Sequence, residues 1–86
     1  MQPQNVSGWE LLNEEPPKLQ REFVFKDFVE ALEFVNKVGD LAESIDHHPD
    51  ITINYKKVTL TLFTHDINGL SEKDYALAEK INHLVP

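Results

Sequence analysis

The chain has 86 residues, of which 41% are hydrophobic and 27% charged, and its formal net charge is −7. A chain of this size and composition folds around one small core, so we expect a single domain over residues 1–86. The absence of cysteine excludes disulfides, thiol catalysis and cysteine-based metal sites, and the acidic balance disfavours nucleic acid and anionic lipid as partners.

The N-terminal segment MQPQNVSGW has neither a basic region nor an apolar run. No segment of the chain reaches the ~18 consecutive apolar residues that a membrane span requires. We therefore expect a cytoplasmic protein with no membrane contact.

Two strands are predicted in the first part of the chain. Residues 8–12 form a short apolar stretch, and the turn at 13–17 ends in two prolines that prevent regular continuation. Residues 19–25 alternate between apolar and polar, which is typical of a half-buried strand. Arg21 interrupts the apolar face of this strand, which indicates a position near the edge of the sheet.

A long helix is predicted over residues 27–45, with Asp27 as its N-cap. Its apolar side chains recur at helical spacing and form an unusually wide stripe. We expect this helix to contact a sheet on one side and another subunit on the other. The stripe consists of Phe28, Val29, Ala31, Leu32, Phe34, Val35, Val38, Leu41, Ala42 and Ile45.

Two further strands and a second helix complete the predicted fold. Residues 51–55 and 58–63 alternate as strands, joined by a hairpin at Lys56-Lys57. A loop at 66–70 leads to a capping pattern at Ser71 and Asp74, ahead of a helix whose inner face carries Leu77, Ala78, Ile81, Leu84 and Val85. The order strand-strand-helix-strand-strand-helix predicts an α+β fold, a four-stranded antiparallel sheet with helices packed on one face.

The segment DHHPD at residues 46–50 places His47 and His48 between the first long helix and the third strand. Histidine can give or take a proton near neutral pH, which makes the pair a candidate acid and base. Two other interpretations are open: polar surface residues at a helix end, or a metal site with His65 and a carboxylate. The usual zinc-binding spacings are absent, so we predict no metal.

Three other residues bear on this candidate site. Glu43 lies four residues before His47, so it could orient that imidazole from the last helical turn. Asp74 could reach a site beside His65, although its capping role already accounts for it. His83 falls in the last turn of the final helix, where a surface histidine facing the helix dipole is the default.

At these intervals the residues resemble the signature of the pterin-4a-carbinolamine dehydratases. The resemblance covers nearly the whole chain. It rests on Gly8-Trp9, the segment REFVFKDF at 21–28, Glu43-x-x-x-His47-His48-Pro49, Tyr55, Thr64-His65-Asp66 and the segment GLSEKD at 69–74.

The resemblance implies dehydration of a 4a-hydroxytetrahydropterin to the quinonoid dihydropterin, in tetrahydropterin recycling, without metal or other cofactor. It implies that His47 and His65 transfer protons and that His48 binds and positions the substrate. It further implies a supporting role for Glu43, weaker ones for Asp46 and Asp74, and a turn fixed by Pro49. Homodimers or homotetramers are also implied.

An alternative function on the same fold stays open. The chain could be a non-catalytic module that binds a pterin or mediates protein dimerisation. The three histidines argue against a purely structural oligomerisation domain, because an interface alone does not require three titratable rings around one loop.

Overall fold

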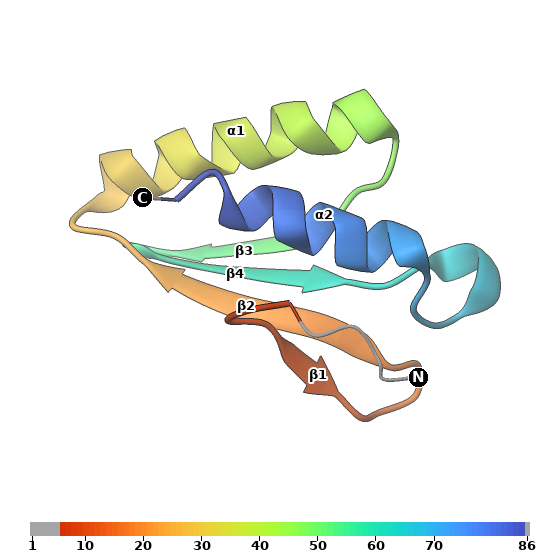
Figure 1. Ribbon diagram of the computed structural model, residues 1–86. Coiled ribbons are helices and arrows are strands. Elements are labelled where there is room, and N and C mark those ends of the chain that lie inside the picture. Colours follow the sequence, from red (N-terminus) through yellow and green to blue (C-terminus); the bar gives the residue numbers. More distant parts are fainter. Residues whose placement is uncertain (1–5, 86) are drawn as a thin grey trace.

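The computed structural model describes residues 6–85, which form a four-stranded antiparallel sheet with both α-helices on one face (Figure 1). The predicted α+β class, element order and one-sided packing are confirmed. The predictions that fall on residues 1–5 and 86 lie outside the described residues. The elements are β1 (Glu10–Leu12), β2 (Lys18–Val24), α1 (Phe28–Ile45), β3 (Asp50–Asn54), β4 (Lys57–Leu62), the 3₁₀ helix η1 (His65–Ile67) and α2 (Glu72–Asn82).

The strands lie in the order β1-β2-β4-β3, so that β2 and β4 are central. Alternation along β4 explains its position, since Val58, Leu60 and Leu62 are fully buried against the helices while the intervening threonines face away. Neither helix of residues 6–85 has the length and apolar character that a membrane-spanning segment needs.

Arg21 lies near an edge of the sheet, as the sequence indicates, because β1 pairs with β2 only as far as Gln20, whereas β4 pairs with Arg21 on the other side. Its charge is accommodated by local partners. The guanidinium lies 4.4 Å from the centre of the Phe23 ring and donates to Asn82 Oδ1 at 2.6 Å. Trp9 Nε1 donates to the same oxygen at 2.9 Å, which fastens the segment before β1 to the end of α2.

The long helix α1 begins as predicted, with the Asp27 side chain accepting a hydrogen bond from Glu30 N at 2.9 Å. Its buried face consists of Ala31, Phe34, Val38 and Ala42. Val35, Leu41 and Ile45 are partly buried against the core. Phe28, Val29 and Leu32 of the predicted stripe stay exposed.

The hairpin between β3 and β4 turns one residue earlier than predicted. Asn54 pairs with Lys57, so the two turn residues are Tyr55 and Lys56 rather than Lys56-Lys57. Tyr55 adopts a positive φ of 59°, a conformation that turns between twisted antiparallel strands require. This register places Ile53 opposite the buried Val58, so apolar side chains share the helix-covered face.

Element ends differ slightly from the sequence prediction. The first strand begins at Glu10 rather than residue 8, the second spans Lys18–Val24 rather than 19–25, and the last strand ends at Leu62. The short helix η1 begins at His65 and overlaps the start of the loop predicted at 66–70. Helix α2 ends at Asn82, yet Leu84 and Val85 still pack against the core after it.

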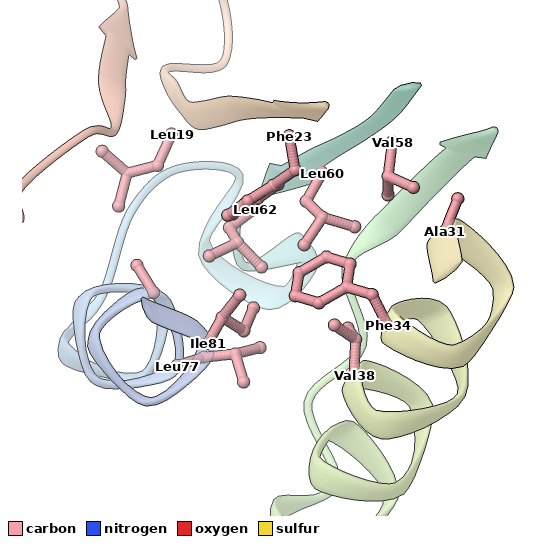
Figure 2. Close-up of a cluster of buried hydrophobic side chains, with 11 residues drawn as sticks. Leu19, Phe23, Ala31, Phe34, Val38, Val58, Leu60, Leu62, Leu77 and Ile81 are labelled. Atoms are coloured by element: carbon pink, nitrogen blue, oxygen red, sulfur yellow. The ribbon is translucent and has the colours of Figure 1, made fainter. Parts of the chain in front are cut away.

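The core lies between the sheet and the two helices, as Figure 2 shows. Phe23 and Phe34 meet at its centre, with their rings 4.8 Å apart. The other members come from β2, β4 and the two α-helices. They include Leu19, Ala31, Val38, Val58, Leu60, Leu62, Leu77, Ala78 and Ile81.

Truncating the core should destabilise the fold strongly. Leu60→Ala removes a fully buried side chain from a central strand, so we expect the free energy of unfolding to fall by about 2–5 kcal/mol. Val24→Ala, at an exposed position on β2, is the matched control and should change it by less than about 0.5 kcal/mol. Urea denaturation measures both, and equal losses would contradict this core.

Candidate active site

A cavity of about 420 Å³ brings together His47, His48 and His65. The first two follow the end of α1, and the third lies just past the end of β4. The adjacent pair His47-His48 and the distant His65 therefore share one cavity. Its walls also contain Asp46, Pro49, Asp50, Phe63 and Thr64.

The C-terminal end of α1 determines where His47 and His48 lie. Asp46 adopts the left-handed conformation, with φ at 55°, and this ends the helix. His47 N then donates to Ala42 O at 3.1 Å, which holds the first residue after the cap close to the helix. Pro49 follows the pair directly and precedes β3, so the two imidazoles lie on a short segment fixed at both ends.

His47 contacts a buried carboxylate. Its Nε2 lies 2.7 Å from Asp74 Oδ1, and only 12% of the imidazole is exposed, against 0% of the Asp74 side chain. The other oxygen of Asp74 accepts hydrogen bonds from Ser71 N at 3.0 Å and Thr64 Oγ1 at 2.7 Å. Asp74 therefore completes the capping box of α2 and holds His47 at the same time.

His48 pairs with Glu43 at the surface. Its Nε2 lies 2.6 Å from Glu43 Oε2, with 52% and 79% of the two side chains exposed. The sequence prediction that Glu43 would orient His47 is wrong. The left-handed residue at Asp46 breaks the helical spacing, so the carboxylate reaches the histidine five positions on, while His47 contacts α2.

His65 is the first residue of η1 and is exposed. Its ring lies 4.3 Å from that of Phe63, tilted by 48°, which limits the orientations of the imidazole. Sequence analysis assigned no site role to Phe63 or Thr64, although both line the cavity. The position of Thr64, directly before a candidate histidine, was the available signal.

The other predicted residues divide between two hollows. Asp46 and Pro49 line the histidine cavity, whereas His83 follows the end of α2 and lines a separate, larger hollow of about 720 Å³ with Phe25 and Phe34. We assign the chemistry to the smaller cavity because it holds the three other histidines. Within residues 6–85, no three His, Asp or Glu side chains are grouped so that they could hold a metal ion.

An α+β layer with three histidines at one cavity, one of them on a buried carboxylate, defines a class of site suited to proton transfer. Comparison with known proteins gives the family. Residues 1–84 match the family model described as pterin 4 alpha carbinolamine dehydratase, and the chain belongs to this family.

Curated relatives carry the same name. A provisionally named pterin-4-alpha-carbinolamine dehydratase of Trichormus variabilis is 51% identical over 83 residues, covering 96% of this chain and 86% of the relative. One from Sulfolobus acidocaldarius is 44% identical over 79 residues, covering 92% and 84%. Both relatives therefore match more than nine tenths of this chain.

Solved structures share the fold. A transcriptional coactivator/pterin dehydratase from Brucella melitensis superposes with a TM-score of 0.87 at 36% identity, covering 94% of this chain and 85% of that one. A pterin dehydratase-like protein described as a RuBisCO assembly factor in the alpha-carboxysome gives 0.76 at 24% identity, covering 90% and 88%. At that identity the second likeness shows the fold alone.

The two carboxylates should differ in their importance for stability. Asp74→Ala leaves several buried partners without an acceptor, so we expect the free energy of unfolding to fall by about 1–3 kcal/mol. Glu43→Ala breaks only an exposed pair and should cost much less. Urea denaturation compares them, and a Glu43→Ala loss as large as that of Asp74→Ala would contradict the geometry.

Proposed function

We propose that the protein dehydrates a 4a-hydroxytetrahydropterin to the quinonoid dihydropterin by histidine acid-base catalysis, in tetrahydropterin recycling. The observation that carries the proposal is the cavity that His47, His48 and His65 share. Membership of the dehydratase family supports it.

The chemistry needs only proton transfers. The C4a–O bond breaks, and the hydroxyl leaves as water after it gains a proton. The proton on N5 passes to a base, and the electrons of the N5–H bond form the C4a=N5 double bond. Atoms and charge balance with one acid and one base, and each transfer by a positioned side chain contributes typically ~10²–10⁴ in rate.

His47 and His65 are the proposed proton-transfer groups. His47 is backed by the Asp74 carboxylate, which stabilises the imidazolium that forms when the ring takes a proton. His65 is exposed and lines the same cavity from a different element, η1, so the two rings can serve different atoms of one bound substrate. No metal or other cofactor takes part in this scheme.

His48 and Glu43 are proposed to bind and position the pterin. Their paired side chains are exposed, and the Glu43 oxygen that does not contact His48 can accept hydrogen bonds from the amino and N–H groups of the pterin ring. Asp46 lines the same cavity and is a weaker candidate, while Pro49 fixes the turn that carries the two histidines.

Kinetics of alanine variants test these roles. His47→Ala and His65→Ala should lower kcat by about 10²-fold or more with modest changes in KM, because each removes a proton-transfer group. His48→Ala should mainly raise KM. The substrate is a freshly generated 4a-hydroxytetrahydropterin, whose loss is followed by ultraviolet absorbance.

His83→Ala is the matched control for these variants. It removes an exposed imidazole that lines the larger hollow rather than this cavity, and it should leave kcat and KM unchanged. Equal, small losses for all four histidine variants would contradict the assignment. Saturable pterin binding without turnover would instead favour the non-catalytic pterin-binding module.

We further propose that the chain forms homodimers or homotetramers. On α1 the apolar side chains of Val29 and Leu32 stay exposed, at 62% and 38%, and β3 is an edge strand that exposes Ile51 and Ile53. Apolar surface of this kind gains stability when a second copy covers it. Edge strands are also available for pairing with another chain.

Disrupting the apolar stripe of α1 tests the assembly. The double variant Val29→Glu/Leu32→Glu should shift the protein toward smaller species in sedimentation velocity, because it places charges in the interface. Lys80→Glu on α2 changes the net charge by the same two units at an exposed position and should leave the assembly unchanged. A double variant that sediments like the unaltered protein would contradict an interface on this stripe.

A further inference from the structure

We propose that Thr64 is a positioning residue for the reaction, which acts on His47 through the carboxylate of Asp74. The inference deepens the proposed function and rests on it. Sequence analysis gave Thr64 no role in the site. The hydrogen bonds of its hydroxyl group indicate one.

Three side chains form a continuous line of hydrogen bonds that ends at His47. Thr64 Oγ1 donates to Asp74 Oδ2 at 2.7 Å, and Asp74 Oδ1 lies 2.7 Å from His47 Nε2. Thr64 Oγ1 is also 2.8 Å from Ser71 Oγ. Since the single proton of the Thr64 hydroxyl is used on Asp74, Ser71 must donate to Thr64.

These hydrogen bonds also determine which atoms carry the protons. An ionised carboxylate only accepts, so Asp74 holds the His47 tautomer that carries its proton on Nε2. The proton assignment follows from the hydrogen-bond network. The second nitrogen, Nδ1, is then the one left to exchange a proton with a substrate.

Thr64 is needed because the Asp74 carboxylate could otherwise rotate. The Asp74 side chain is fully buried, and its Oδ2 accepts two hydrogen bonds, one from the Ser71 amide and one from the Thr64 hydroxyl. The amide bond caps α2 and belongs to the fold. The Thr64 hydroxyl belongs to the residue directly before His65, so it couples the position of one proposed proton-transfer group to the segment that carries the other.

Thr64→Val tests the inference, because valine keeps the shape of threonine and removes the hydroxyl. We expect kcat to fall about tenfold or more while KM changes by less than about twofold, since the loss acts on the orientation of His47. Thr64→Ser retains the hydroxyl and should restore kcat. Thr59→Val is the matched control, within β4 on the uncovered face of the sheet, and should have no effect.

A double-mutant cycle distinguishes positioning from an independent role. If Thr64 acts through Asp74, Thr64→Val should lower kcat by less than about twofold in a protein that already carries Asp74→Asn. The same fold-loss in both backgrounds would overturn the inference.

Nitrogen NMR of the His47 ring gives a readout that does not depend on activity. The unaltered protein should show one tautomer, protonated on Nε2, and Thr64→Val should show a mixture while the His48 signals stay the same. An unchanged His47 tautomer would overturn the inference. If the unaltered protein has no dehydratase activity, the proposed function is wrong. The NMR comparison of the His47 tautomer in the unaltered protein and in Thr64→Val then still tests whether Thr64 positions His47.

Ser71→Ala supplies a second variant should Thr64→Val fail to fold. It removes the hydroxyl that donates to Thr64, while Asp74 keeps its bond from the Ser71 amide. A mixed His47 tautomer is again expected, and a single, unaltered tautomer would count against the inference.

Discussion

The site depends on one buried carboxylate. The Asp74 side chain is inaccessible to solvent, so its hydrogen-bonding partners must come from the protein itself. They are Ser71 at the start of α2, Thr64 after β4 and His47 after α1. A buried carboxylate is tolerated only when its oxygens are bonded in this way. The contacts that keep Asp74 in place therefore also join α2 to the loop that carries His47 and His48.

The sheet and helices provide the rigid support for this arrangement. β4 delivers Phe63, Thr64 and His65 from its end, and its own fully buried side chains anchor it beneath both helices. A site that takes its residues from the ends of well-packed elements can hold them precisely while leaving them open to a ligand. The same fold in a RuBisCO assembly factor shows that the scaffold alone does not determine the function.

Much of this architecture could be predicted from local patterns. Alternation identified the strands, helical spacing identified α1, and the caps at Asp27 and Ser71 identified where the helices begin. The partners of the histidines could not be predicted, because they depend on a left-handed residue at Asp46 and on a contact between positions 27 residues apart. Helical spacing consequently paired Glu43 with the wrong histidine, and the capping pattern at Asp74 did not indicate its contact with His47.

The most direct test of the account is the rate at which the purified protein, treated with a metal chelator, removes freshly generated 4a-hydroxytetrahydropterin. The account predicts a rate well above the spontaneous loss, because histidines supply both proton transfers. A rate equal to the spontaneous one, together with saturable binding of a dihydropterin, would contradict it and leave the cavity as a pterin-binding site without catalysis.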